Sequence, residues 1–250
     1  MVLKKIIARN FSRAAPDYDT ATPVQQQSAE ILFSLLQNST VAKPRFLDIG
    51  VGCGRLFSLA RRQFGAELQL HGIDFAPQML EQTRKYFPES QLYFCDAENY
   101  NYPLDWYDWI VSNFALQWCE QPRLLLQRLY KALRPGGQVA VALPVRGSLS
   151  RLAAVVERLS GETLPLYPLP EAGEFADLAG EVPRPALKEQ YFFASYPNAY
   201  AALAAIKRAG AHTTTQNVLS ARAFRLLREH PQGFRLDYKV LFICAKKPVP

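Results

Sequence analysis

The fold is decided by one glycine-rich stretch, Phe46-Leu47-Asp48-Ile49-Gly50-Val51-Gly52-Cys53-Gly54. An apolar run leads into glycines spaced G-x-G-x-G, which let the backbone pass close to a ligand at a strand-to-helix turn. The spacing differs from the G-x-G-x-x-G fingerprint of dinucleotide sites, where a helix N-terminus faces a pyrophosphate. The stretch therefore predicts a ligand site, and its spacing favours a ligand without a pyrophosphate.

Short apolar runs alternate with amphipathic segments along the chain that follows. Strands are expected at residues 45–49, 68–74, 92–95, 107–113 and 138–143. Helices are expected at residues 53–64, 77–86 and 121–133, with a turn at 134–137. This alternation indicates a parallel sheet with helices on both faces, and the continuous apolar strands fit a sheet that is covered on both sides.

The alternation changes after Pro144. We expect a helix at 148–159, loops and short helices in the proline-rich segment 160–186, a strand at 187–195, helices at 199–209 and 221–229, and a strand at 236–246. These elements predict an α/β, Rossmann-like domain with a mostly parallel seven-stranded sheet. Its expected parts are an N-terminal lid segment (1–40), a cofactor-binding core (41–145), an insertion that adds to the lid (146–186) and a C-terminal completion of the sheet (187–250). The lid would cover the carboxyl ends of the strands, where open α/β sheets bind ligands.

The composition is typical of a globular protein, with 49% hydrophobic and 20% charged residues. The sequence contains no run of 18 apolar residues, and its first residues lack a secretory apolar segment. We therefore expect a cytoplasmic protein that does not act at a membrane. The four cysteines and three histidines are scattered, without the spacing of a disulfide framework or a zinc site, so no bound metal is expected.

The excess of positive charge lies in the last fifth of the chain. Residues 200–250 hold nine basic and two acidic residues, whereas residues 1–199 hold 20 of each. This asymmetry predicts an acidic partner, with the candidate contacts Lys207, Arg208, Arg222, Arg225 and Arg228. A solvated helix surface is the alternative interpretation. Nucleic acid is not expected as the partner, because no stacking-aromatic motif accompanies the modest charge.

A carboxylate follows the second expected strand. Asp74 lies 20 residues past Gly54, where it can accept both ribose hydroxyls, as in NAD sites. On these features alone a dehydrogenase remains open. The third strand then ends in an acidic cluster (95–98), the fourth in Ser112-Asn113-Phe114-Ala115-Leu116-Gln117-Trp118, and Arg134-Pro135-Gly136-Gly137 precedes the fifth. This ordered set, over about residues 45–143, resembles the class I S-adenosylmethionine-dependent methyltransferases.

The resemblance implies S-adenosylmethionine as the cofactor and assigns residues to its parts. The implied contacts are Asp48, Gly50, Gly52 and Gly54 for the methionine part, Asp74 for the ribose, Phe75, Met79, Asp96 and Ala97 for the adenine, and Asn113 for the sulfonium and the amino-acid head.

The segments outside the core resemble a narrower family. Several segments are similar to the malonyl-[acyl-carrier-protein] O-methyltransferases of biotin synthesis: the opening 7–19 with Val24-Gln25, the stretch 112–119, Gly147-Ser148-Leu149, the stretch 206–211 and the tail 238–242. The resemblance is weak over 160–186, and Thr22 stands where the family commonly has alanine. It implies methyl transfer to the free carboxylate of malonyl-acyl carrier protein, and this acidic carrier would suit the basic C-terminal surface.

The implied reaction needs no catalytic base. A carboxylic acid has a pKa of about 4, so the nucleophile is already ionised at pH 7. The expected work of the protein is alignment and exclusion of water. The residues expected to position the substrate are Tyr18, Gln25, Gln117 and Trp118, with Arg13 and Arg146 as candidate ionic partners of the carboxylate.

Two other functions remain open from the sequence. The chain could methylate another small carboxylic acid or a quinone-like carbon, in which case the charge reversals Arg222→Glu and Arg225→Glu would leave activity untouched. It could also be a non-catalytic cofactor-binding scaffold, because a fold does not fix a function. Malonyl-coenzyme A also remains open as an alternative to malonyl-acyl carrier protein.

Overall fold

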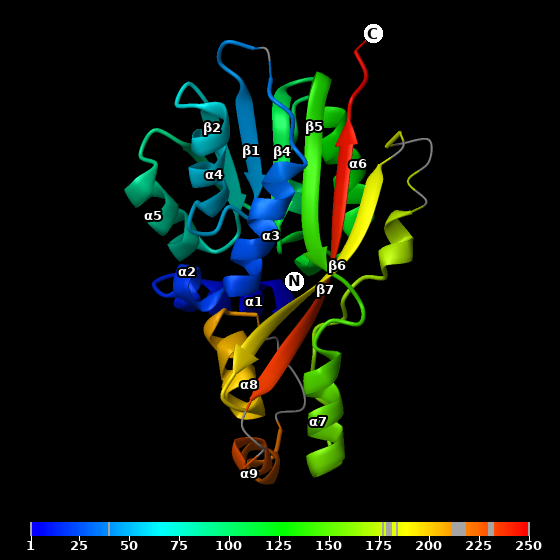
Figure 1. Ribbon diagram of the computed structural model, residues 1–250. Helices are drawn as coiled ribbons and strands as arrows, with labels where there is room; N and C mark the ends of the chain where they lie inside the picture. The colour runs from blue at the N-terminus through cyan, green and yellow to red at the C-terminus, as the bar shows by residue number, and fades with distance from the viewer. Residues whose placement is uncertain are drawn as a thin grey trace.

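The computed structural model describes residues 2–39, 41–176, 178, 182–183, 185–211, 219–229 and 233–249. Its centre is a seven-stranded sheet in the order β3-β2-β1-β4-β5-β7-β6 (Figure 1). The strands are β1 (Arg45–Ile49), β2 (Gln69–Asp74), β3 (Gln91–Phe94), β4 (Tyr107–Asn113), β5 (Leu133–Pro144), β6 (Ala186–Tyr196) and β7 (Phe234–Lys246). Strands β1 to β5 are parallel, and β7 pairs antiparallel with both β5 and β6. The expected mostly parallel seven-stranded sheet is confirmed.

Helices cover both faces of the sheet. On one face lie α3 (Pro23–Ser34), α4 (Arg55–Phe64) and α5 (Pro77–Tyr86), and on the other lies α6 (Pro122–Ala132). Helix α4 buries Leu56, Phe57, Leu59 and Ala60, and its last residue, Phe64, stacks on Trp109 of β4 with ring centroids 4.1 Å apart. This apolar packing fixes the end of α4 against the sheet.

Several boundaries differ from the expected ones by one or more residues, and two of these differences have a clear local reason. Helix α4 begins at Arg55 rather than at residue 53, because Gly54 has a left-handed backbone with φ of 82°. The expected turn at 134–137 is instead part of β5. The end of β7 draws it into the sheet, since Gly136 N–H donates to Lys247 O and Lys247 N–H donates to Gly137 O.

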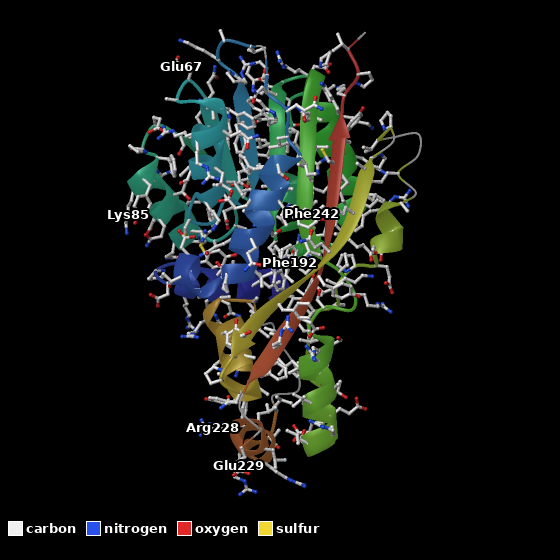
Figure 2. All side chains as sticks on the ribbon, in the orientation of Figure 1. Glu67, Lys85, Phe192, Arg228, Glu229 and Phe242 are labelled. Carbon is white, nitrogen blue, oxygen red and sulfur yellow. The ribbon has the colours of Figure 1, made fainter. Side chains whose placement is uncertain are left out.

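A helical lobe extends beyond the carboxyl ends of the parallel strands (Figure 1). Helices α7 (Ser150–Ser160), α8 (Ala199–Arg208) and α9 (Ala221–Glu229) share one apolar cluster with parts of β6 and β7. Helices α1 (Val2–Ala14) and α2 (Tyr18–Ala21) lie between the sheet and this lobe. Figure 2 labels Phe192 of β6 and Phe242 of β7, whose rings are 6.1 Å apart and belong to the apolar cluster between the sheet and helices α3 and α4.

Among the described residues, none of the helices has the length and apolar character that crossing a membrane requires.

Candidate active site

A cavity lies at the carboxyl ends of β1, β2 and β4, where the glycine-rich loop turns into α4. Seven of the residues expected to bind the cofactor line it: Asp48, Gly50, Gly52, Asp74, Phe75, Met79 and Asn113. Asp96 and Ala97 line an adjoining hollow together with Asp74 and Phe75. Gly54 lines neither space; it caps α4, and a Cβ there would lie 3.0 Å from the Phe87 ring.

Two carboxylates in this cavity have different surroundings. Asp48 is 1% exposed, and neither carboxylate oxygen has a hydrogen-bond partner among the described residues. Burial, with the charge of Asp74 nearby, raises the pKa of Asp48 well above its usual range. Asp74 accepts hydrogen bonds from the N–H groups of Gly52 (3.0 Å) and Ala76 (2.8 Å), yet burial still raises its pKa to about 6.

These surroundings fit S-adenosylmethionine. A buried carboxylate without a partner is costly unless a cation or hydrogen-bond donor meets it, and the ammonium of the methionine part would be such a group for Asp48. The backbone N–H groups fix the orientation of Asp74, whose oxygens suit the two ribose hydroxyls.

The glycine loop leaves no room for a side chain at its first glycine. Gly50 has φ of 73°, and a Cβ built there would lie 2.3 Å from Cβ of Ala115. The N–H groups of Gly50 and Val51 both donate to Ile73 O, at 2.8 and 3.0 Å. The loop is therefore held between the end of β2 and the segment after β4.

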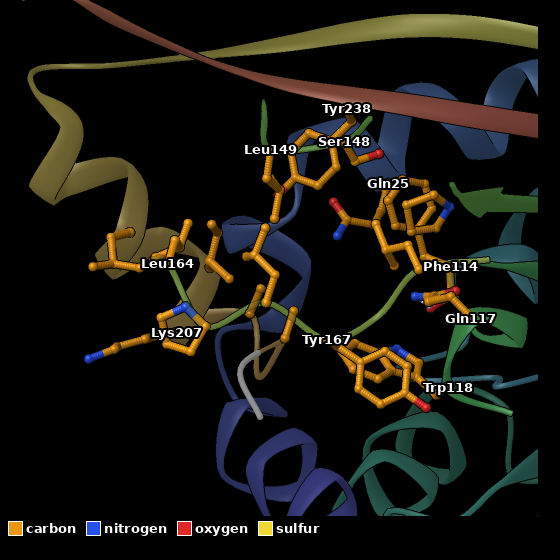
Figure 3. A pocket seen from close by; sticks show the side chains of 18 of the residues that line it. Gln25, Phe114, Gln117, Trp118, Ser148, Leu149, Leu164, Tyr167, Lys207 and Tyr238 are labelled. Atoms are coloured by element: carbon orange, nitrogen blue, oxygen red, sulfur yellow. Dashed lines mark hydrogen bonds between the residues drawn. The ribbon is translucent and has the colours of Figure 1, made fainter. Parts of the chain in front are cut away.

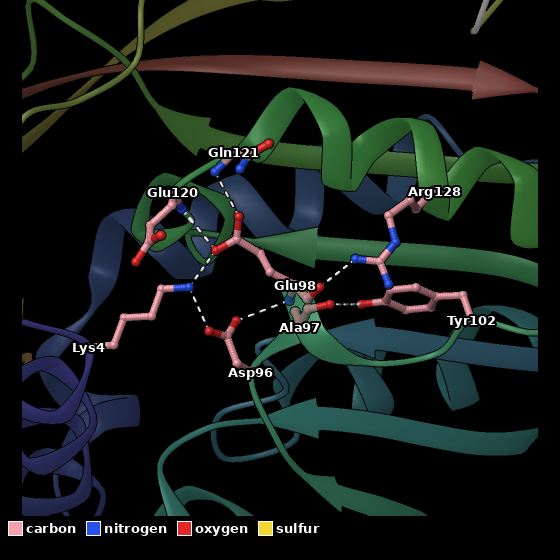
Figure 4. A network of polar contacts seen from close by, with 8 residues as sticks. All are labelled: Lys4, Asp96, Ala97, Glu98, Tyr102, Glu120, Gln121 and Arg128. Atoms are coloured by element: carbon pink, nitrogen blue, oxygen red, sulfur yellow. Dashed lines mark hydrogen bonds and ion pairs between the residues drawn. The ribbon is translucent and has the colours of Figure 1, made fainter. Parts of the chain in front are cut away.

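The end of the cavity that is expected to hold the adenine is joined to the N-terminal helix by a polar network (Figure 4). Lys4 of α1 donates to Asp96 at 2.6 Å and to Glu98. Glu98 also accepts the N–H groups of Glu120 and Gln121, at 2.9 and 2.7 Å, at the start of α6. Burial opposes the charge of Lys4, but its bonds to the two carboxylates outweigh this and raise its pKa. These bonds fasten α1 over the adenine end of the cavity.

Asn113 acts on a neighbouring helix. Its side-chain oxygen accepts from Ser28 at 2.8 Å, and its nitrogen donates to Gln25 O at 2.9 Å. Because both polar atoms of the Asn113 amide bind α3, Asn113 fixes Gln25 at the edge of the cavity.

A second, larger cavity of about 350 Å³ opens beside the first. Four of the five residues expected to position the substrate line it, Tyr18, Gln25, Gln117 and Trp118, and the fifth, Arg146, does not. Figure 3 shows Gln25, Gln117 and Trp118 among these lining side chains. Five residues line both cavities: Phe11, Tyr18, Gln25, Phe114 and Trp118. A group bound in one cavity is therefore separated from the other cavity by this shared wall only.

Neutral hydrogen-bonding groups lie at the wall that the two cavities share and next to it. Gln117 donates to Phe114 O at 2.8 Å, while its side-chain oxygen is buried and has no partner among the described residues. The indole N–H of Trp118 is likewise buried and unpaired in the part of the chain that is described. Burial raises the pKa of Tyr18, so its hydroxyl is neutral at pH 7 and can donate a hydrogen bond.

The two arginines proposed as ionic partners of a carboxylate lie elsewhere. The Arg146 side chain is 72% exposed, and its Nε lies 2.7 Å from a carboxylate oxygen of Glu171. Arg13 is exposed as well. Neither residue lines the cavities. Of the described residues, the larger cavity has one cationic lining residue, Lys207, which Figure 3 shows at its outer side.

The sequence did not single out four further lining residues, Phe11, Ser148, Tyr167 and Tyr238, as site residues. Phe11, Ser148 and Tyr238 belong to stretches that carry the family resemblance, and this resemblance is the sequence signal that could have identified them as site residues. Tyr167 lies in the segment of weak resemblance, and its ring is 4.8 Å from that of Trp118. No local sequence pattern predicts the contact between Tyr167 and Trp118.

The five basic residues proposed for an acidic partner lie together on the lobe. Lys207 and Arg208 end α8, and the other three, Arg222, Arg225 and Arg228, belong to α9. All five are exposed, and none of them forms an ion pair with a residue that the structure describes.

Comparison with known proteins identifies the family. Residues 46–137 match the methyltransferase domain family. A malonyl-[acyl-carrier protein] O-methyltransferase of Pectobacterium atrosepticum is 31% identical over 247 residues, which cover 96% of this chain and 95% of that protein. The chain belongs to the malonyl-[acyl-carrier protein] O-methyltransferase family. The biotin biosynthesis bifunctional protein BioHC of Teredinibacter turnerae is 28% identical, over 98% of this chain and 47% of that longer protein.

Solved structures agree on the fold. Phosphoethanolamine N-methyltransferase 2 of Haemonchus contortus, solved with S-adenosylhomocysteine, matches with a TM-score of 0.58 and 21% identity, over 94% of this chain and 57% of that one. A putative methyltransferase of Bacillus halodurans matches with a TM-score of 0.61 and 12% identity, over 89% and 100%. The expected Rossmann-like methyltransferase fold is confirmed. The protein is a methyltransferase, and S-adenosylmethionine is the cofactor that its family and its cavity indicate.

Proposed function

We propose that the protein transfers a methyl group from S-adenosylmethionine to the free carboxylate of malonyl-acyl carrier protein, giving the malonyl methyl ester used in biotin synthesis. The observation that carries this proposal is the wall that the cofactor cavity shares with the larger cavity. The proposal is further supported by the alignment of nearly the whole chain with a malonyl-[acyl-carrier protein] O-methyltransferase. Four free cysteines accord with a reducing compartment such as the cytoplasm, which is the location included in the proposal.

Each cavity has its own part in this reaction. Asp48, Asp74 and the glycine loop would hold S-adenosylmethionine, which supplies an electrophilic methyl group on a sulfonium sulfur. Tyr18, Gln25 and Gln117 would hold the malonyl carboxylate with neutral hydrogen-bond donors. Holding two reactants in a good geometry can supply about 7–11 kcal/mol of a barrier, and this alignment is the main catalytic contribution that we assign to the protein.

No residue needs to remove a proton. The malonyl carboxylate is ionised at pH 7, and its oxygen forms the new bond to the methyl carbon as the carbon–sulfur bond breaks. Trp118, packed against Phe11 and Tyr167 with ring centroids 5.6 and 4.8 Å away, excludes water from the junction of the cavities. A dry junction favours transfer to the carboxylate over transfer to solvent.

The lid is the part of the proposal that concerns organisation. Residues 1–40 and 146–186 would close over the core 41–145, while 187–250 complete the sheet and present the basic surface. Lys4, which bonds to Asp96 and Glu98, supports this role for the N-terminal segment. The carrier protein would meet the exposed cations of α8 and α9 through charge complementarity.

The test is methyl transfer from labelled S-adenosylmethionine to malonyl-acyl carrier protein, malonyl-coenzyme A and free malonate. We expect base-labile label on the carrier-bound malonyl group and none on free malonate. A protein that binds the cofactor, shown by calorimetry, but labels no malonyl substrate would refute the proposal. Equal labelling of free malonate would favour a small-molecule carboxyl methyltransferase instead.

A further inference from the structure

Helices α8 and α9 enclose a groove that adjoins the larger of the two active-site cavities. Its volume is about 390 Å³, and its walls include the apolar residues Leu203 and Phe224 and the cations Lys207, Arg225 and Arg228. Arg208 and Arg222 belong to the same two helices but do not line it. Three of the five basic residues proposed for an acidic partner therefore line the groove.

The groove adjoins the larger cavity, because Leu203, Lys207 and Phe224 line both spaces. A ligand that passes over these three side chains would lead from the surface of the lobe toward the wall that the two active-site cavities share.

The cations of the groove keep their charge available. None of the three forms an ion pair with a residue of the described ranges. Lys207 Nζ lies 5.0 Å from the Phe224 ring, while the Arg228 guanidinium lies 4.3 Å from the Tyr200 ring and donates to its hydroxyl at 3.0 Å. Aromatic contacts of this kind orient a cation without neutralising it.

We infer that this groove binds the pantetheine-linked phosphate of a phosphopantetheine arm, with Arg225 and Lys207 as the main contacts. The inference rests on the proposed function, because a malonyl thioester reaches the cavity on such an arm. This phosphate is a compact anion that arginine can bind with two parallel hydrogen bonds. The apolar floor at Leu203 and Phe224 suits the uncharged pantetheine chain that follows.

The test compares two small substrates that differ in the phosphate alone, malonyl-phosphopantetheine and malonyl-pantetheine. For the wild type we expect kcat/KM to be about tenfold higher with the phosphate, the size of one charge-assisted hydrogen bond. Arg225→Ala should remove this preference by lowering kcat/KM for malonyl-phosphopantetheine to that for malonyl-pantetheine. The matched control is Arg158→Ala, which removes an exposed arginine of α7 outside the groove and should keep the preference.

Each outcome separates this inference from the proposed function. A wild-type protein that binds the cofactor but does not methylate malonyl-acyl carrier protein refutes the proposed function. Equal kcat/KM for the two thioesters in the wild type, or an equal loss for both in Arg225→Ala, overturns the groove alone. Malonyl-acyl carrier protein and malonyl-coenzyme A both carry the arm, so Arg225→Ala should slow both; a loss confined to the carrier protein would indicate a contact with the carrier's own surface and overturn the inference.

Discussion

Replacing Gly50 by alanine tests the cofactor loop most directly. The new methyl group would lie 2.3 Å from Cβ of Ala115, whereas non-bonded carbons prefer about 3.5–4.0 Å. The obstacle is a side-chain carbon attached directly to the backbone, so no rotamer change can relieve it. Gly50 also has φ of 73°, in the left-handed region that residues with a Cβ rarely adopt.

The two effects can be added. A left-handed backbone costs a residue with a Cβ about 1–2 kcal/mol, and overpacking a close-fitting site costs about 1–3 kcal/mol. We therefore expect Gly50→Ala to lower the free energy of unfolding by about 2–5 kcal/mol. In a chain of this size each kcal/mol lowers Tm by about 2–4 °C, so the fall in Tm should be on the order of 10 °C.

The assay is thermal and urea unfolding of the cofactor-free protein, with Gly52→Ala as the matched control. Gly52 also has a positive φ, 54°, but a Cβ there would meet its nearest atoms, Gly50 O and Tyr18 Cε1, at 3.9 Å. The control should therefore show the backbone cost alone. Adding Ala115→Gly to Gly50→Ala removes the obstructing methyl and should recover about 1–3 kcal/mol. Equal losses for the two single variants, with no recovery in the double variant, would refute the steric argument.

Four further predictions concern charge. Asp48→Asn removes an unpaired buried carboxylate, so Tm of the cofactor-free protein should rise at pH 7 while calorimetry shows S-adenosylhomocysteine binding about tenfold weaker or more; a lower Tm with unchanged binding would contradict this reasoning. Burial raises the pKa of Asp74 to about 6, so its contribution to stability is fully present below its unfolded pKa of about 4 and is lost as the pH rises through 6. Cofactor binding needs the ionised form and should strengthen from pH 5 to 7, a slope that Asp74→Asn should flatten. Lys4→Met breaks the contact with Asp96 and should speed dissociation of S-adenosylhomocysteine about fivefold in stopped-flow traces; an unchanged rate would show that α1 does not retain the cofactor. Arg222→Glu should lower kcat/KM for malonyl-acyl carrier protein at low salt and have little effect at 0.5 M salt, and a salt-independent loss would argue against steering.

The core and the cofactor loop could be predicted because their signals are local. Strand β4 occupies the expected residues 107–113, since an apolar run bounded by polar residues marks a buried strand. The positions of Asp48 and Asp74 follow from their strands, because Asp48 lies one residue before the end of β1 and Asp74 ends β2. Helix α9 was also placed correctly at Ala221–Glu229 from its own amphipathic pattern.

Contacts between distant segments could not be predicted in this way. Lys4 and Asp96 are 92 positions apart, and nothing near either residue indicates the other. Arg146 had the charge expected of a carboxylate partner, but Glu171, in an irregular segment without periodicity, pairs with it at the surface. The joining of α7, α8 and α9 into one lobe depends on apolar contacts with β6 and β7, which only the folded chain brings together.

The scarcity of cations at the substrate cavity has a chemical reason. An arginine beside the malonyl carboxylate would stabilise its full negative charge before the reaction, and such ground-state binding does not accelerate transfer. The opposite charges of a carboxylate and a sulfonium cancel as the methyl group moves, so the transition state carries less charge than the reactants. Apolar surroundings favour the less charged state, and the described lining is apolar apart from a few neutral donors, with Lys207 at the outer side (Figure 3). Of the cations of the groove, Arg225 and Arg228 do not line this cavity, so neither would stabilise the reacting carboxylate at the position proposed for it.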